Sequence, residues 1–191
     1  MKLLFATTNN GKLKEVRKVF SETAFTILSL ADFPPVPEII EDGATFAENA
    51  KIKAKTIYDL FHVPTLADDS GLSVDQLNGE PGVFSARYAG ENASDEANNK
   101  LLLKKLSNFP EPHYAKFVCS SVFYDGEKFI VAEDIMVGKI IHELRGVNGF
   151  GYDPLFIAEG FSVTNGELSL EEKNKISHRA KAFNRLKKIF W

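Results

Sequence analysis

The chain has 191 residues, 44% of them hydrophobic, which is enough for one domain or two small lobes around a sizeable core. Its net charge of −3 argues against a general nucleic-acid or acidic-membrane binder, because such proteins need a basic face. The single cysteine excludes an intramolecular disulfide and a cysteine-based zinc site. No apolar run reaches transmembrane length, and the apolar N-terminus is too short for a signal peptide, so we expect a soluble, cytoplasmic protein.

The N-terminal third alternates predicted strands and helices. Leu3–Ala6 is an apolar strand, and the polar turn Thr7–Gly11 leads into a helix from about Lys12. A second strand is predicted near Thr26–Leu30. A capping box then begins a helix that we place at Thr45–Phe61.

The remaining predicted elements include strands that pair directly. In chain order they are a strand at Thr65–Ala67 ending in two aspartates, a strand at Leu72–Asp75, a helix from Ser94 to Leu106, a hairpin of Phe117–Tyr124 with Lys128–Val137, a strand at Leu155–Ile157, and a helix from Ser177 to about Phe190. Strands that both alternate with helices and pair directly predict an α/β fold with a mixed sheet. No linker interrupts the chain, so we predict a single domain over residues 1–191, with a second lobe built around residues 75–140.

The turn between the first strand and helix has the character of an anion site. Its residues are Thr7, Thr8, Asn9, Asn10, Gly11 and Lys12. A strand–turn–helix of this kind presents backbone N–H groups and a helix N-terminus to an anion, although the Walker spacing is absent. Taken alone, the segment is better explained as an ordinary polar loop.

Lys53 lies within the apolar stripe of its helix, between Ala50 and Ile57, and Asn49 shares that face. Lysine is almost never fully buried without a partner. Either Lys53 extends its ammonium from the edge of the stripe into water, or the helix lines a polar cleft.

Asp68 and Asp69 follow an apolar strand. Adjacent side chains on an extended chain face opposite ways, so at most one points readily into a given site. Paired acids at a strand end suit Mg²⁺ binding and general-base chemistry, and they are also common as caps and turn formers. Glu41 lies just before the capping box and adds a further carboxylate.

The predicted C-terminal helix begins with Ser177, His178 and Arg179. Basic residues repel the positive end of a helix by about 0.3–1 kcal/mol each, so an anion such as phosphate between them would make sense of the arrangement. A solvated basic turn is the alternative explanation. Lys173 either joins this cluster or belongs to a mixed surface with the two glutamates before it.

Phe150 lies between two glycines, where an aromatic side chain either stacks on a base or packs under a tight turn. None of the four histidines has metal-ligand spacing to another, which argues against a zinc enzyme. No nucleophile motif is present.

Together these segments resemble the inosine triphosphate pyrophosphatase family, the dITP/XTP pyrophosphatases. The matching pieces are Ala6-Thr7-x-Asn9-x-x-Lys12-x-x-Glu15, Glu41-x-Gly43-x-Thr45-Phe46-x-Glu48-Asn49-Ala50, Ala67-Asp68-Asp69-Ser70-Gly71, Pro81-Gly82-x-x-Ser85-Ala86-Arg87-Tyr88, Gly149-Phe150-Gly151-Tyr152-Asp153-Pro154, and Glu172-Lys173-Asn174-x-x-Ser177-His178-Arg179. The resemblance implies an elongated mixed sheet, two lobes flanking a deep substrate groove, a homodimer, and Mg²⁺-dependent hydrolysis of non-standard purine nucleoside triphosphates to the monophosphate and pyrophosphate.

The resemblance also implies roles for particular residues. It makes Asp69 the proton acceptor and assigns the metal to Glu41 and Asp69, with Asp68 as a further candidate. The implied substrate contacts are residues 7–12, Lys53, Ser70, Phe150, Gly151, Tyr152, Asp153, Lys173, His178 and Arg179. Asn78 and Asn148 replace glycines usual in the family, and asparagine tolerates positive φ, so we expect both loops to be preserved.

Two other kinds of function share some of these features. A nucleotide-binding sensor without hydrolysis would hold phosphates in the same way, but it gains nothing from carboxylates near a triphosphate unless they hold a metal. A nucleic-acid-binding module is disfavoured by the acidic charge.

Overall fold

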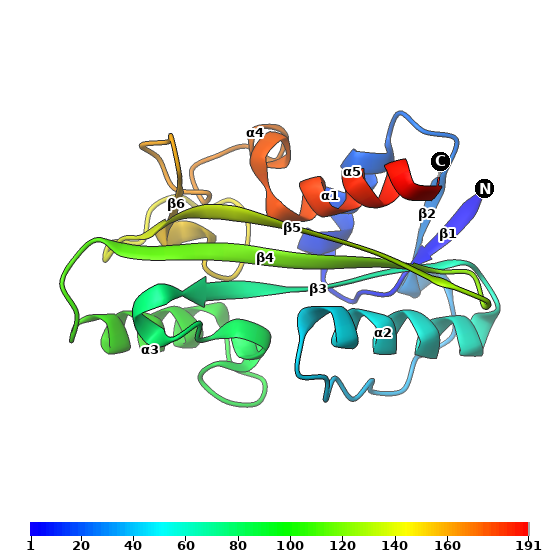
Figure 1. Ribbon diagram of the computed structural model, residues 1–191, viewed down its shortest axis with the longest axis horizontal. Helices are drawn as coiled ribbons and strands as arrows, with labels where there is room; N and C mark the ends of the chain where they lie inside the picture. The colour runs from blue at the N-terminus through cyan, green and yellow to red at the C-terminus, as the bar shows by residue number, and fades with distance from the viewer. Residues whose placement is uncertain (191) are drawn as a thin grey trace. The chain divides into compact units, whose positions relative to one another are not determined.

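The computed structural model describes residues 1–190, with side chains through Ile189, and contains a six-stranded sheet in the order β2-β1-β3-β4-β5-β6. The strands are β1 (Lys2–Phe5), β2 (Thr26–Ser29), β3 (Thr65–Val74), β4 (His113–Tyr124), β5 (Phe129–Ile140) and β6 (Phe156–Ala158). β1 pairs in parallel with β2 and β3, whereas β5 pairs antiparallel with β6. The predicted mixed α/β sheet is therefore confirmed (Figure 1).

Five α-helices accompany the sheet within the described residues. They are α1 (Asn10–Phe20), α2 (Phe46–Phe61), α3 (Asp95–Leu106), α4 (Leu170–Ile176) and α5 (His178–Phe190). The Asn9 side chain caps α1 by accepting from the Lys12 amide at 3.0 Å. The predicted capping box of Thr45 and Glu48 begins α2. Within residues 1–190, no helix combines the length and apolar character needed to cross a membrane.

The chain forms two compact units. Unit 1 contains Met1–Asp69, Cys119–Asp134 and residues from His178 onward, and unit 2 contains Ser70–Val118 and Ile135–Ser177. Strands β3, β4 and β5 contribute residues to both units.

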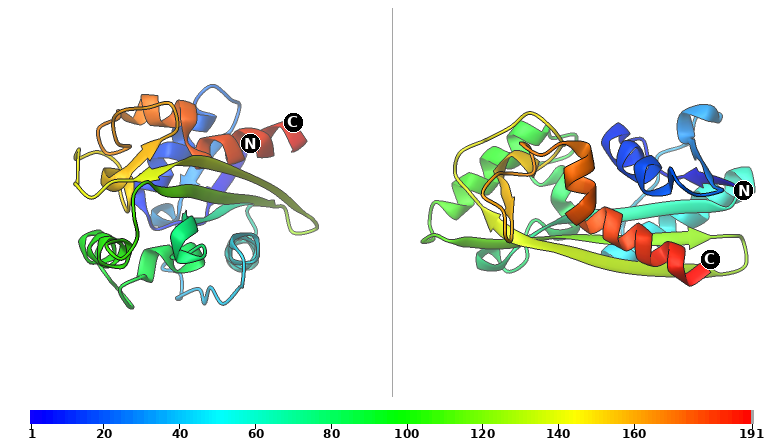
Figure 2. Two further views of the ribbon diagram at one scale, coloured as in Figure 1. Left: turned by 60° about the vertical axis from the view of Figure 1, so that its left-hand side comes forward. Right: turned by 90° about the horizontal axis from the view of Figure 1, so that it is seen from above.

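Unit 1 packs helices on both faces of its part of the sheet. Helices α1 and α5 contact one another on one face, with a core that includes Leu66, Phe5 and Phe183 (Figures 1 and 2). Helix α2 covers the other face, with a core that includes Ala67 and Ala54 (Figure 1). Leu66 and Ala67 thus face opposite cores, as alternation along a strand requires.

Unit 2 has its own core, to which β3, α3, β4, β5 and β6 contribute. Leu72 on β3, Leu102 on α3 and Phe156 on β6 are fully buried there. The loop before β6 is anchored in the same core through Tyr152 and Leu155.

One element prediction was wrong, and two others were right except for their bounds. β3 is one strand of ten residues, so Asp68 and Asp69 lie inside it and not at a strand end. Both predicted hairpin strands are present, but the first begins earlier than predicted, at His113, and the second ends later, at Ile140. The predicted C-terminal helix is confirmed as α5, which begins directly after Ser177. Ser177 is also the C-cap of α4, a helix of only seven residues that the sequence analysis missed.

The two asparagines that replace family glycines behave differently. Asn78 has φ +52°, as expected for asparagine in a glycine-like position. The positive-φ non-glycine residues of residues 1–190 are His62, Asn78 and Asn92, so Asn148 does not need the left-handed conformation. Instead, its amide Nδ2 donates to the Leu168 carbonyl at 3.1 Å.

Candidate active site

Unit 1 contains a buried carboxylate, Asp68, that is paired with two cations. Lys12 Nζ lies 3.2 Å and Arg179 Nε lies 3.0 Å from Asp68 Oδ2. Arg179 also reaches Glu15, with Nη1 at 2.5 Å from Oε2. The sequence predicted an anion between the basic residues at the start of α5. For Arg179, the structure shows that anionic groups of the protein itself, the carboxylates of Asp68 and Glu15, lie beside the guanidinium.

A second group of charges surrounds Asp69. Its Oδ1 lies 3.5 Å from Lys53 Nζ, and its Oδ2 accepts from Asn49 Nδ2 at 3.2 Å. Lys53 also donates to Glu41 Oε2 at 2.7 Å. Lys53 is therefore directed into a polar, charged site, and the first explanation of its position, an ammonium extended into water, is wrong.

Strand alternation separates the two aspartates, as predicted. Asp68 follows Leu66 by two residues and points to the face of α1 and α5, where Lys12 and Arg179 lie. Asp69 follows Ala67 and points to the face of α2, where Asn49 and Lys53 lie. One strand thus supplies two carboxylates with different partners.

The electrostatics of the site follow from this arrangement. Burial by itself raises the pKa of Asp68, but Lys12, Arg179 and Lys53 outweigh it and hold that pKa well below its ordinary value. Burial likewise works to lower the pKa of Lys53, but Asp69, Glu41 and Asp68 raise it above its ordinary value. Asp68 therefore remains ionised and Lys53 remains cationic at neutral pH.

The predicted phosphate loop borders a pocket of about 310 Å³ in unit 1. Thr7, Thr8 and Asn10 line it together with residues 29–31 and 34–36. Within the loop, the Asn9 amide donates to Thr7 Oγ1 at 3.1 Å, and the Asn9 side chain caps α1. Asn9 thus fixes the loop's shape and directs the first turn of α1.

Unit 2 contains a separate cluster built on Asp153. Its Oδ2 accepts from Lys173 Nζ at 2.6 Å and from the Phe150 amide at 2.9 Å, and its Oδ1 accepts from Asn165 Nδ2 at 3.2 Å. The Lys173 ammonium lies 4.8 Å from the centre of the half-buried Phe150 ring. A buried carboxylate therefore positions both the lysine and the aromatic loop.

The rest of the aromatic loop is tied to neighbouring elements. The Gly151 amide donates to Asp95 Oδ2 at 2.6 Å, and Asn99 Nδ2 donates to the Gly151 carbonyl at 3.1 Å. Tyr152 is buried, and its hydroxyl donates to the Ser85 carbonyl at 2.9 Å. These contacts fix the backbone around Phe150.

The remaining predicted site residues lie where the two units meet in sequence. Ser70 is half-buried and is the first residue of unit 2, directly after Asp69. His178 is buried and is the first residue of α5 in unit 1, directly after Ser177.

Sequence reasoning gave no role to several residues that shape these clusters. Glu15, Asn49, Asn165 and Asp95 each bind a predicted site residue through a side chain. Asn49 was visible as a polar residue on the stripe of α2. Glu15 was visible only as part of the first family motif, because its partner Arg179 lies 164 residues away in the sequence. Asn165 gave no signal in the sequence.

The carboxylates of unit 1 suit a hard cation. Asp68 Oδ1 is buried and has no hydrogen-bond partner among residues 1–190. Glu41 and Asp69 both direct oxygens at the Lys53 ammonium, so a position for positive charge exists between them. Mg²⁺ takes oxygen ligands and is usually held by one or two carboxylates plus substrate phosphates. Glu41, Asp69 and Asp68 therefore have the chemistry to hold Mg²⁺.

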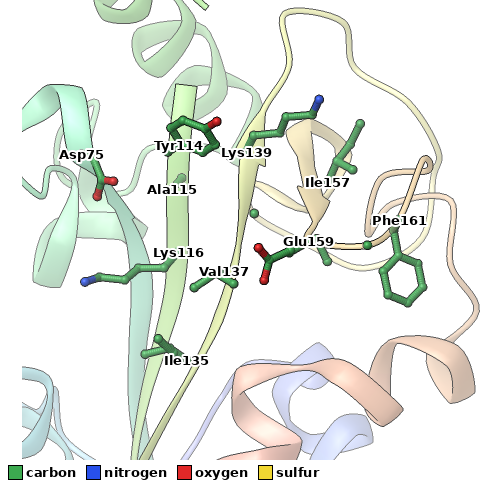
Figure 3. A pocket seen from close by; sticks show the side chains of 13 residues that line it. Asp75, Tyr114, Ala115, Lys116, Ile135, Val137, Lys139, Ile157, Glu159 and Phe161 are labelled. Atoms are coloured by element: carbon green, nitrogen blue, oxygen red, sulfur yellow. The ribbon is translucent and has the colours of Figure 1, made fainter. Parts of the chain in front are cut away.

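A second pocket, of about 540 Å³, lies in unit 2 and contains none of the predicted site residues (Figure 3). Tyr114 and Lys116 of β4, Val137 of β5 and Phe161 after β6 are among the side chains that line it. Most of its lining residues are apolar, and four are charged, namely Asp75, Lys116, Lys139 and Glu159.

Comparison with known proteins gives full-length matches. The Ham1 family profile matches residues 3–189. A dITP/XTP pyrophosphatase from Geobacter sulfurreducens is 49% identical over 97% of this chain and 94% of its own length, and one from Listeria innocua is 48% identical over 98% and 93%. A HAM1 protein structure from Coxiella burnetii matches with a TM-score of 0.89 and 36% identity, over 100% of this chain and 98% of that one. The Staphylococcus aureus Ham1 protein matches with a TM-score of 0.86 and 38% identity over the same shares.

Proposed function

The chain belongs to the Ham1 family, and we propose that it hydrolyses non-standard purine nucleoside triphosphates, such as ITP, dITP and XTP, to the monophosphate and pyrophosphate. Relatives named dITP/XTP pyrophosphatase, 49% and 48% identical over nearly the whole chain, support this assignment. The observation that carries it is Asp69, a carboxylate with the Lys53 ammonium at one oxygen and the Asn49 amide at the other.

In the proposed reaction, a water molecule gives a proton to Asp69 while its oxygen bonds to the α-phosphorus. The bond between that phosphorus and the oxygen bridging to the β-phosphate breaks, and pyrophosphate leaves with the bridging oxygen. Lys12 and Lys53 stabilise the negative charge on the phosphates. Glu41 and Asp69, with Asp68 as a further candidate, would hold Mg²⁺, which supplies neutralisation of phosphate charge when bound.

For the base, we propose recognition by the loop of unit 2 that carries Phe150. Stacking on an aromatic ring is available to any purine, so it gives affinity without selecting the base. Selection against adenine then requires donors directed at the 6-oxo group. A 6-amino group leaves such buried donors unpaired, at a cost of about 1–3 kcal/mol each.

The other residues implied by the family resemblance have supporting roles in this proposal. Asp153 and Lys173 position the aromatic loop, as their contacts with the Phe150 amide and ring suggest. Arg179 holds Asp68 in place. Ser70 directly follows Asp69 in the sequence, and His178 directly precedes Arg179. Residues 7–12 supply backbone N–H groups to the phosphates.

The decisive experiment is a nucleotide panel assayed separately for pyrophosphate and orthophosphate in the presence of Mg²⁺. We expect pyrophosphate release from ITP, dITP and XTP, little from ATP, and a loss of at least about 1000-fold in Asp69→Asn because the proton acceptor is gone. Orthophosphate as the sole inorganic product would refute the proposal. Tight ITP binding without turnover by the wild-type protein would identify a nucleotide sensor instead.

We also propose that the protein is a homodimer. Support comes from the apolar pocket of unit 2, where Tyr114, Ile135, Val137 and Phe161 are large apolar side chains exposed to solvent. Grouped apolar side chains of this kind often mark a protein–protein interface. Light scattering coupled to gel filtration measures the assembled mass, and a monomeric mass at micromolar concentration would contradict the proposal.

A further inference from the structure

Three side chains of types that can bind a metal ion meet at the open end of the β4–β5 hairpin, entirely within unit 2. His113 begins β4, Glu111 lies two residues before it, and His142 lies two residues after the end of β5. One ligand atom from each side chain lies within 4.8 Å of the others. The two histidines are 29 residues apart in the sequence, which is why their spacing gave no metal signal.

The hydrogen bonds around His113 determine which of its nitrogens is available. Gln76 Nε2 donates to the Pro110 carbonyl at 2.8 Å, so Gln76 Oε1 is the atom that faces His113 Nδ1, at 2.6 Å. An amide oxygen only accepts, so Nδ1 must carry the proton. Nε2 of His113 is therefore the nitrogen with a free lone pair, and it points at His142 Nε2. Orientation of a ligating histidine by a hydrogen bond at its other nitrogen is a regular feature of metal sites.

The distances suit an ion with imidazole and carboxylate ligands. The two Nε2 atoms are 2.8 Å apart, and His142 Nε2 lies 3.6 Å from Glu111 Oε1. Ligand atoms of a tetrahedral Zn²⁺ ion, at about 2.0–2.1 Å from the metal, lie about 3.3 Å from one another. Separation of the two imidazoles by about 0.5 Å would therefore open a three-ligand site.

The three side chains differ in their exposure to solvent, so one is held rigidly and two are accessible to an ion. His113 is fully buried, so its imidazole is held in a fixed position. The His142 and Glu111 side chains are 42% and 70% exposed, so an ion reaches them from solvent.

From this arrangement we propose that Glu111, His113 and His142 form a binding site for a transition-metal ion of the Zn²⁺ type, with water as the fourth ligand. Two imidazoles favour Zn²⁺ and similar ions over Mg²⁺, which prefers oxygen alone. The site shares no residue with the carboxylates of unit 1. A bound ion would tie the start of β4 to the segment after β5.

The test uses the full-length protein in a buffer with excess Mg²⁺, titrated with Zn²⁺ by calorimetry and with Co²⁺ by visible absorption. The ligand variant is His142→Gln, which changes an exposed side chain. The matched control is His62→Asn, which removes an imidazole at the end of α2, where asparagine tolerates the positive φ of 53°. We expect one Co²⁺ equivalent with a tetrahedral spectrum in the wild type and in His62→Asn, and at least about tenfold weaker binding in His142→Gln.

Two further variants separate ligation from general folding effects. Glu111→Gln removes the exposed carboxylate ligand, and Gln76→Leu removes the acceptor that orients His113 and is expected to weaken binding by about 10–100-fold. Circular dichroism checks that each variant is folded. Equal Zn²⁺ affinity in the wild type and in His142→Gln would overturn the proposal. So would the absence of Co²⁺ binding when the wild type, at about 100 μM, is mixed with one equivalent of Co²⁺, because that concentration is well above the dissociation constants usual for such sites. In either case the two imidazoles are joined by a hydrogen bond alone.

Discussion

Arg179 Nε donates to Asp68 Oδ2 at 3.0 Å, and the two side chains are 2% and 1% exposed. This buried ion pair connects the first turn of α5 to β3. Glu15 shares the same guanidinium, so Arg179, a predicted substrate contact, is paired with two carboxylates of the protein itself.

Arg179→Met should lower the free energy of unfolding by about 3–5 kcal/mol, because it leaves the carboxylates of Asp68 and Glu15 buried without their guanidinium. Arg185→Met is the matched control on the same helix. The Arg185 side chain is 66% exposed and pairs with Asp134, so its loss should cost about 0–1 kcal/mol. Urea unfolding at pH 7 measures the change in the free energy of unfolding for each variant. Equal changes would show that the buried ion pairs of Arg179 stabilise the protein no more than the exposed pair of Arg185 does.

Asp68→Asn should flatten the loss of stability in acid. The folded-state pKa of Asp68 lies below its ordinary value of 3.8, so on acidification the unfolded chain binds the proton first. The stabilisation contributed by ionised Asp68 is fully present at pH values above its ordinary pKa, and it is lost as the pH falls through the lower pKa of the folded state. Urea unfolding between pH 5 and about 2 should therefore show a slope shallower in the variant by up to about 1.4 kcal/mol per pH unit. Parallel curves would contradict the assignment.

Lys53→Met should reduce kcat for ITP by at least about 100-fold, because it removes a buried ammonium proposed to stabilise phosphate charge. Lys55→Met is the matched control on the same helix. Lys55 is exposed and pairs only with Asp59 in the described structure, so we expect activity within about twofold of wild type. Initial rates of pyrophosphate release give both values. A normal kcat in Lys53→Met would remove this lysine from the proposed mechanism.

Phe150→Leu should raise KM for ITP with a smaller effect on kcat, since it removes the ring proposed to stack on the base. Loss of one stacking contact corresponds to about 1–3 kcal/mol, or about 5- to 150-fold. Phe161→Leu changes a phenylalanine in the apolar pocket of unit 2 and should leave KM unchanged. Steady-state kinetics distinguishes the two, and similar KM values in both variants would exclude base stacking by Phe150.

Cys119 should react slowly with an aromatic disulfide reagent in the folded protein. Burial first, and the nearby Asp68 second, raise the pKa of its thiol well above the ordinary value, so the reactive thiolate is scarce and inaccessible. In urea, one thiol per chain should react at the rate of a free cysteine. Fast modification under native conditions would show that the core around Asp68 opens readily.

The sequence by itself determined the local structure and the family. Apolar periodicity located α1 and α2, the Thr45–Glu48 capping box located the start of α2, and alternation separated Asp68 from Asp69. These features depend on residues within about four positions of one another, so the sequence alone is enough to predict them. The motif pieces, in their order along the chain, were enough to indicate the Ham1 relatives.

Only the tertiary structure decided which charges meet. Arg179 binds Glu15 across 164 residues, and His113 faces His142 across 29, because packing and strand pairing bring distant segments together. The tertiary structure also shows that β3 continues unbroken through its two aspartates, where the local sequence predicted the end of a strand. Buried charge needs a partner wherever the fold can place one, and the identity of that partner depends on long-range packing that no local pattern records.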